Sequence, residues 1–226
     1  MLEVLAKIPG RSKIAYKYSE TDIAHAAVLL RGFKGELRGF KEESVVDEHT
    51  FWLDFAATNP NLSDQSDTAV YQQQILEIID RIQLHEVNKV VLSRPSHLYT
   101  ERADAQATFA ALQERYSNCT VFALKHPDFG HWMGASPEVL FEEIDGGYRS
   151  MSLAGTRLSG ALNWGDKERE EQNFVTEEIH KTLDNFGGHV RTQGEETLNA
   201  GPVEHLMTLV VTDAMNAPAV EALEAL

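Results

Sequence analysis

The chain has 226 residues, of which 42% are hydrophobic, enough for one large or two small globular domains with a hydrophobic core. Lys and Arg number 20 against 35 Asp and Glu, and the formal net charge of -15 argues against a nucleic-acid partner, because phosphate binding needs a basic surface. The single cysteine, Cys119, excludes an intrachain disulfide, and no apolar run approaches a membrane span, which predicts a cytoplasmic protein with no membrane partner.

The N-terminal part of the chain predicts short strands and turns. Residues 14–18 and 51–55 are short apolar or aromatic runs bounded by turn formers. The irregular stretch 59–64, Asn-Pro-Asn-Leu-Ser-Asp, predicts an internal boundary. We therefore divide the chain into an N-terminal segment, 1–64, and a motif-bearing portion, 65–226.

The second portion predicts both helices and strands. Its first helix is marked by isoleucines that recur at helical period, namely Ile75, Ile78, Ile79 and Ile82. A strand is predicted at 87–94, a helix at 103–116, a strand at 120–125 and a helix at 166–183. The apolar run 139–141, the pair Gly146-Gly147 and the segment 148–153 predict a hairpin. Helices and strands that do not strictly alternate favour the α+β class over a doubly wound sheet.

Lys89 is the first candidate for chemistry. On the predicted strand it shares a face with Val87 and Val91, because side chains alternate along a strand. An ammonium on an apolar face is desolvated, which lowers the pKa of a lysine and frees it to act as a base. A lysine at a strand edge that extends into water is the alternative, and the spacing leaves both open.

Glu138 is the second candidate, because it separates a turn at 134–137 from the apolar run 139–141. Burial there would raise the pKa of the carboxyl and suit a general acid near neutral pH. The alternative is a glutamate at a strand end that points into solvent. The sequence around it supports the two interpretations equally.

The acidic segment 166–175 is the third candidate. Glu168 and Glu171 are neighbours on one helical face. Glu171 also lies in line with the apolar residues expected to face the core, which are Phe174, Val175 and Ile179. Paired carboxylates on an inward face suit Mg²⁺, which prefers oxygen ligands. A solvated acidic face near a helix start, where negative charge is favourable, is the alternative.

Two weaker signals lie further along. The small residues around Gly155 end a strand where backbone amides can approach an anion, although most such segments are ordinary turns. His205 stands between apolar neighbours, where a hydrogen-bonded structural histidine is the commoner interpretation.

Five segments, taken in order, resemble the chorismate-binding family. The family comprises isochorismate synthases, salicylate synthases, and the synthase components that make anthranilate and aminodeoxychorismate. The matching segments are 89–94 (KVVLSR), 134–138 (GASPE), 153–157 (LAGTR), 167–171 (KEREE) and 203–206 (VEHL). The resemblance covers the chain from about Ile75 to its end. It implies part of a fold like that of anthranilate synthase component I, with antiparallel sheet and packed helices.

The resemblance also implies catalytic roles. Lys89 would be the general base that activates water, and Glu138 the general acid that protonates the departing hydroxyl as chorismate becomes isochorismate. Family members that aminate chorismate typically lack this lysine, so Lys89 favours an isochorismate synthase, an isomerase of menaquinone or siderophore biosynthesis. Salicylate synthases also carry the lysine and go on to eliminate pyruvate, and they remain the alternative.

Binding roles follow from the same resemblance. Glu171, with Glu168 nearby, would help to hold the Mg²⁺ that binds the ring carboxylate of chorismate. The backbone around Gly155 would contact a substrate carboxylate, and His205 would lie close to the ring. The metal would supply a local positive field for an anionic substrate in a chain of strongly negative charge.

The chain departs from the family pattern in two places. Gln172 stands where histidine is common in the metal-binding helix. After Leu226 the family continues with a His-Pro-Thr-Pro-Ala element, a second magnesium glutamate and basic residues that hold the substrate carboxylates. We therefore expect a C-terminally truncated form that is inactive as it stands. A non-catalytic binding protein, or a chain completed by a partner chain, is the further alternative.

Overall fold

The computed structural model describes residues 1–31, 37–53, 55, 68–94, 96, 104–213, 215 and 219–226. The chain divides into two compact units, one formed by Met1–Ala57 with Asp104–Leu226 and the other by Thr58–Ala103. The boundary predicted at 59–64 lies outside the described residues. None of the described helices combines the length and the apolar character that a membrane crossing requires.

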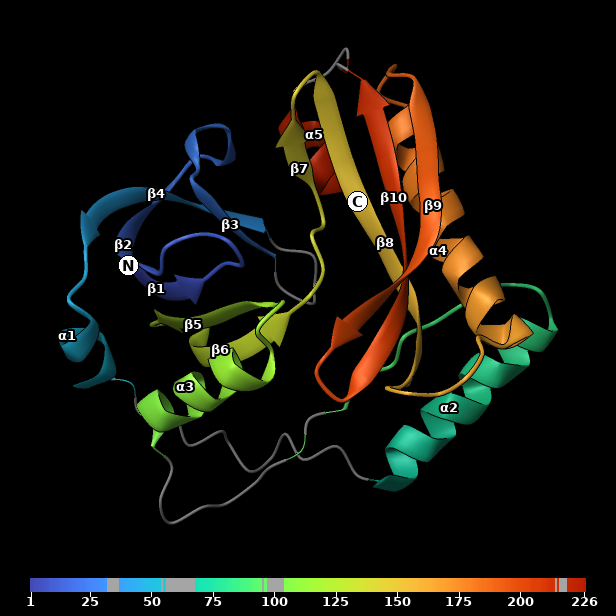
Figure 1. Ribbon diagram of the computed structural model, residues 1–226, viewed down its shortest axis with the longest axis horizontal. Helices are drawn as coiled ribbons and strands as arrows, with labels where there is room; N and C mark the ends of the chain where they lie inside the picture. The colour runs from blue at the N-terminus through green and yellow to red at the C-terminus, as the bar shows by residue number, and fades with distance from the viewer. Residues whose placement is uncertain are drawn as a thin grey trace. The chain divides into compact units, whose positions relative to one another are not determined.

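The first unit contains two antiparallel sheets and several helices (Figure 1). In chain order its elements are β1 (Leu2–Lys7), β2 (Ile14–Thr21), the 3-10 helix η1 (Ile23–His25), β3 (Val28–Arg31), β4 (Leu37–Val45), α1 (Glu48–Leu53), α3 (Ala105–Arg115), β5 (Thr120–His126), β6 (Gly130–Ser136), β7 (Glu142–Ile144), β8 (Gly147–Leu158), α4 (Asp166–Asp184), β9 (Val190–Ala200), β10 (Val203–Asp213) and α5 (Ala219–Ala225). The expected α+β class and antiparallel sheet are confirmed.

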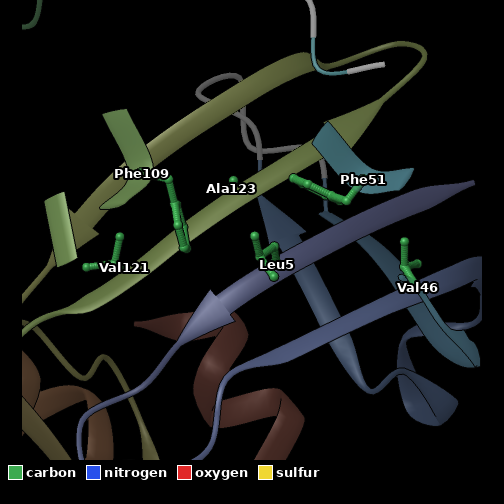
Figure 2. Close-up of a cluster of buried hydrophobic side chains, with 6 residues drawn as sticks. All are labelled: Leu5, Val46, Phe51, Phe109, Val121 and Ala123. Carbon is green, nitrogen blue, oxygen red and sulfur yellow. The ribbon is translucent and has the colours of Figure 1, made fainter. Parts of the chain in front are cut away.

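The six-stranded sheet has the order β3-β4-β2-β1-β5-β6 and packs one face against α1 and α3. Figure 2 shows the resulting core, which is built from Leu5, Val46, Phe51, Phe109, Val121 and Ala123. Burial of such aliphatic and aromatic side chains is the main favourable contribution to folding. One charge is enclosed as well: Lys125 Nζ lies 2.7 Å from the Glu3 carboxylate and donates to the Phe51 carbonyl oxygen at 3.0 Å.

Residues 51–53 lie in a helix and not in a strand, which corrects the strand predicted at 51–55. Phe51 lies in α1, and the residue before Glu48 explains why a helix begins there. Asp47 Oδ1 accepts a hydrogen bond from the Thr50 backbone amide at 3.0 Å, which satisfies one of the amides that a helix start leaves without a partner. Phe51 therefore enters the hydrophobic core as part of a helix and not as part of a sheet.

The four-stranded sheet has the order β7-β8-β10-β9, and α4 runs along it (Figure 1). Ile179 and Leu183 of α4 pack against Val190 and Val210 of the sheet, together with Ala222 of α5. The predicted hairpin is present as β7 and β8, but its first strand begins at Glu142. The apolar run 139–141 precedes the strand and lies outside it.

The second unit contains α2 (Thr68–Gln83), which confirms the helix predicted from the isoleucine spacing. The strand predicted at 87–94 is wrong: these residues have no regular secondary structure. An apolar run becomes a strand only when another strand supplies backbone hydrogen bonds. No described strand pairs with residues 87–94.

Candidate functional site

Two of the candidate segments meet at an irregularity between β8 and β10. In the pairing of these strands Leu153 lies opposite Met207 and Thr156 lies opposite His205. Ala154 and Gly155 therefore oppose a single residue of β10, which is the arrangement of a β-bulge. A bulge shifts the pairing of the two strands by one residue and changes the direction of the side chains beside it. The register between the 153–157 and 203–206 segments therefore depends on this bulge.

Gly155 lies against the backbone of α4. A Cβ atom at this position would sit 2.8 Å from the Glu168 carbonyl oxygen, closer than real Cβ atoms approach, and 3.0 Å from Leu206 Cδ1, which is a tight contact. The glycine is therefore required by the close approach of strand and helix. This contact brings the Gly155 backbone beside the first turn of the helix that carries Glu168 and Glu171.

His205 lies on β10 opposite Thr156, and its Nδ1 atom is 2.9 Å from the Thr156 hydroxyl oxygen. Burial lowers the pKa of the imidazole, and a hydrogen bond to the Gly155 backbone offsets only part of that effect. The neutral ring therefore predominates at neutral pH and can both donate and accept one hydrogen bond. The structure thus places two of the predicted binding residues, Gly155 and His205, in contact.

Arg157 and Glu204, which flank these residues, form a cross-strand ion pair. Arg157 Nε donates to Glu204 Oε2 at 2.8 Å, and the two residues are directly opposite in the β8–β10 register. The guanidinium carbon also lies 4.1 Å from the centroid of the Trp164 ring. The hydrogen bond from Arg157 lowers the pKa of the Glu204 carboxyl. This pair fixes the ends of the two strands just beyond the bulge.

Glu168 and Glu171 are both half-buried on α4. Glu168 Oε2 accepts a hydrogen bond from the Gly165 backbone amide at 3.1 Å, so this carboxylate caps the start of its own helix. The centre of the buried stripe is displaced from the predicted one, because the buried residues of α4 are Gln172, Ile179 and Leu183. Glu171 lies beside that stripe.

In the described part of the chain, no three His, Cys, Asp or Glu side chains are grouped so that they could hold a metal ion. The donor chemistry of Glu168 and Glu171 is nevertheless compatible with Mg²⁺, because this ion keeps several waters and commonly takes one or two carboxylates together with substrate oxygens. Glu168 retains a second carboxylate oxygen beyond the one used for the cap. The pair therefore fits a partial ligand set.

Gln172 is a polar residue in the core that the sequence marked only as a departure from the family pattern. Its side chain is 1% exposed and bonds to β8 and β10 together. A signal in the sequence could have identified it. Gln172 precedes Ile179 by seven residues and Leu183 by eleven, so its amide lies on the same helical stripe as these two apolar residues. Its contacts are described below.

Glu138 lies on the loop between β6 and β7 and its side chain is exposed, so of the two interpretations that its neighbours left open the structure favours the one in which it points into solvent. Val139 and Leu140 are also exposed, which removes the apolar setting. The loop is nonetheless attached to β8: the Met151 amide donates to the Val139 carbonyl at 3.0 Å, and Ser150 Oγ donates to the Leu140 carbonyl at 2.6 Å. The residues directly after Glu138 are therefore hydrogen-bonded to β8, the strand that also contains Gly155.

Lys89 belongs to the second unit and is half-buried in an irregular segment. The shared strand face with Val87 and Val91 is absent, and Val91 is largely exposed. The structure therefore assembles Gly155, His205 and the α4 glutamates within one unit, whereas Lys89 lies in the other. The roles of Lys89 and Glu138 stay predictions.

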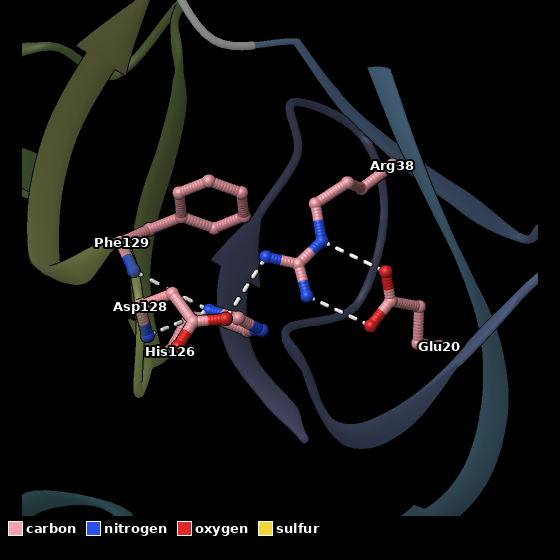
Figure 3. A network of polar contacts seen from close by, with 5 residues as sticks. All are labelled: Glu20, Arg38, His126, Asp128 and Phe129. Carbon is pink, nitrogen blue, oxygen red and sulfur yellow. Dashed lines mark hydrogen bonds and ion pairs between the residues drawn. The ribbon is translucent and has the colours of Figure 1, made fainter. Parts of the chain in front are cut away.

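A second charged cluster lies in the six-stranded sheet (Figure 3). Arg38 donates to the Glu20 carboxylate at 2.8 and 2.7 Å and to Asp128 Oδ2 at 3.0 Å, and its guanidinium lies 4.9 Å from the Phe129 ring centroid. These hydrogen bonds lower the pKa of both carboxyls. His126 Nδ1 accepts from the Asp128 backbone amide at 3.1 Å. The cluster fastens β4 to β2 and to the β5–β6 turn, and we assign it a structural role.

Comparison with known proteins identifies the family. A family model described as chorismate binding enzyme matches residues 41–226. The chain belongs to this chorismate-binding enzyme family. The match includes all five segments whose order resembled the family in the sequence, so that assignment is confirmed.

Among the individual relatives of this family member are isochorismate synthases. It is 28% identical over 152 residues to isochorismate synthase MenF of Escherichia coli strain K12, a match covering 62% of this chain and 35% of MenF. It is 25% identical over 157 residues to MenF of Pasteurella multocida strain Pm70, covering 64% and 36%. The chain therefore spans about a third of the length of these relatives.

Solved structures share the fold. The structure of Bacillus anthracis DhbC, described as a 2,3-dihydroxybenzoate-specific isochorismate synthase, gives a TM-score of 0.70 at 18% identity and covers 99% of this chain and 71% of DhbC. Escherichia coli MenF, the menaquinone-specific isochorismate synthase, gives 0.62 at 16% identity, with 100% and 68% covered. At these identities the likeness establishes the chorismate-binding fold.

Proposed function

We propose that this chain carries part of the site of a Mg²⁺-dependent isochorismate synthase, which isomerises chorismate to isochorismate. The observation that supports this most directly is the β8 bulge, where Gly155 contacts α4 and His205. Its position within a chorismate-binding family member, together with isochorismate synthases among the relatives, favours this activity within the family.

In the proposed reaction Lys89 removes a proton from water as the water oxygen adds to one ring carbon of chorismate. Glu138 gives a proton to the hydroxyl on another ring carbon, and that group leaves as water. One water enters and one leaves, so the product is an isomer of the substrate. The exposed position of Glu138 is compatible with a group that must meet the substrate from solvent.

The neighbouring residues would bind the substrate. The Gly155 backbone would contact a carboxylate, and the neutral His205 ring would lie against the chorismate ring. Glu171 and Glu168 would hold Mg²⁺, directly or through water. Bound there, the ion would offset the negative charge of the substrate carboxylate.

The test is an isochorismate assay with chorismate and Mg²⁺ on this chain and on the complete product of its gene. Whichever of the two proteins turns chorismate over, we expect EDTA and Lys89→Ala each to abolish that turnover. Lys41→Ala, which removes an exposed lysine of the six-stranded sheet, should leave turnover unchanged. Full activity in Lys89→Ala would disprove the proposed base.

Pyruvate release, measured in the same reactions, separates the alternative within the family. A salicylate synthase would form pyruvate in proportion to chorismate consumed, whereas an isochorismate synthase would form none. Chorismate binding without either product would instead identify a non-catalytic binding protein. Each result assigns a different function to the same site.

A further inference from the structure

The buried amide of Gln172 connects α4 to two strands of the four-stranded sheet. Its Nε2 atom donates to the Ser152 carbonyl oxygen at 2.9 Å and lies 3.1 Å from Ser152 Oγ and 3.3 Å from Thr208 Oγ1. Its Oε1 atom accepts from the Ala154 backbone amide at 2.9 Å. A neutral amide has both donor and acceptor atoms, and here both are used although the residue is 1% exposed.

The bond to Ala154 has a specific structural cause. Ala154 and Gly155 are the two residues of β8 that oppose Leu206 alone, so the regular ladder is interrupted there. A backbone amide that is withdrawn from water without a partner is costly, and the bulge would leave the half-buried Ala154 amide without a strand partner. Gln172 accepts that hydrogen bond in place of a strand.

We propose that Gln172 is a positioning residue for the chorismate site, an inference that rests on the function proposed above. By holding the bulge from α4, it fixes Gly155 against the helix that carries Glu168 and Glu171. The same bulge sets the register in which His205 faces Thr156. Gln172 thereby fixes the distance between the Gly155 backbone, which is proposed to bind substrate, and the helix α4, which is proposed to bind the metal.

Three variants test this role. Gln172→Met keeps the length of the side chain but removes every hydrogen bond. Gln172→His supplies one donor and one acceptor from a neutral ring. Ile179→Val is the matched control, because it loosens the same buried face of α4 without contacting the bulge. For each protein we would measure hydrogen exchange of the backbone amides and the Kd for chorismate with Mg²⁺.

We expect the Ala154 amide of Gln172→Met to exchange about tenfold faster or more, and the Kd for chorismate to rise about tenfold. Ile179→Val should lower the melting temperature while leaving both quantities near those of the unmodified protein. Gln172→His should recover a substantial part of the protection and of the affinity. This combination would establish positioning as distinct from a contribution to stability alone.

Two outcomes overturn the proposal and leave the proposed function intact: an Ala154 amide that stays protected in Gln172→Met, or faster exchange with an unchanged Kd. A Kd that rises equally in Ile179→Val would also overturn it, since lost stability would then explain the effect. If the unmodified protein, including the complete gene product, binds no chorismate, the proposed function fails and the positioning role fails with it.

Discussion

At the scale of single residues, the site depends on how closely strand and helix approach each other. Gly155 leaves no room for a side chain between β8 and the backbone of α4. Its neighbour across the strands, His205, is held by the Thr156 hydroxyl and by the Gly155 backbone. A change at either residue therefore acts on the geometry of the bulge and on the proposed binding surface together.

Replacing Gly155 by Ala should destabilise the protein by about 1–3 kcal/mol, because overpacking forces the backbone apart. Gly155→Val should cost more, since the added atoms meet the same Glu168 carbonyl and Leu206 side chain. Chemical denaturation of the three proteins measures the loss. A Gly155→Ala protein as stable as the unmodified one would contradict the close approach.

His205 should make stability depend on pH. Its pKa is lowered in the folded protein, mainly by burial, whereas in the unfolded chain the imidazole titrates near 6.5. As the pH falls below about 6.5, the unfolded state binds the proton first, so the free energy of unfolding decreases until the pH passes the folded pKa.

Unfolding curves recorded between about pH 7 and about pH 5 should show this decrease. His205→Gln should make the decrease smaller, because the imidazole whose pKa burial lowers is then absent. His126, whose pKa burial also lowers, would account for a remaining part. An equal slope in His205→Gln and the unmodified protein would refute the assignment.

At the scale of elements, α4 combines a helix start, a core contact and the candidate metal ligands. Glu168 caps the helix through the Gly165 amide, and Gln172 and Ile179 bury one stripe of it. The acidic first turn is also favourable for the helix dipole. Part of the acidic character of this helix thus has a structural explanation that is independent of any metal.

Two substitutions of Glu168 separate the cap from the proposed ligand. Glu168→Ala should cost about 1 kcal/mol of stability, since the Gly165 amide loses its partner. Glu168→Gln retains an acceptor oxygen and should keep most of that stability. If Glu168 also helps to hold Mg²⁺, both variants should weaken Mg²⁺-dependent chorismate binding about tenfold.

Denaturation curves and calorimetric titrations of chorismate, with and without Mg²⁺, measure these effects. Glu178→Gln, at an exposed position further along α4, serves as the charge-matched control. Should Glu168→Gln bind chorismate as tightly as the unmodified protein at every Mg²⁺ concentration, Glu168 is a helix cap and has no part in metal binding.

At the scale of the whole molecule, the formal charge of -15 opposes the approach of an anionic substrate. In the absence of Mg²⁺, chorismate should therefore bind more tightly as salt screens this repulsion, with a Kd a few-fold lower at about 0.15 M NaCl than at about 0.01 M. Titration at both salt concentrations checks this. Weaker binding at the higher concentration would mean that local cations, and not the net charge, dominate the site.

Much of the secondary structure followed from periodicity. Sequence spacing predicted α2, α3, α4, β5 and the β7–β8 hairpin, since each pattern is local and its hydrogen bonds are made within the element or with a nearby strand. The predictions at 51–55 and 87–94 were wrong for the opposite reason. Whether an apolar run becomes a strand depends on a partner strand that can lie far away in the sequence. A capping residue such as Asp47 can direct the run into a helix instead.

The sequence by itself determined the family and the identity of the candidate residues, because both depend on which residue types occur in which order. Only the tertiary structure decided which of them meet. It placed Gly155, His205 and α4 around one bulge, buried Gln172 and left Glu138 exposed. Burial and contact arise from strand register and from the packing of helix on sheet, which join residues far apart in the chain and leave no local pattern to read.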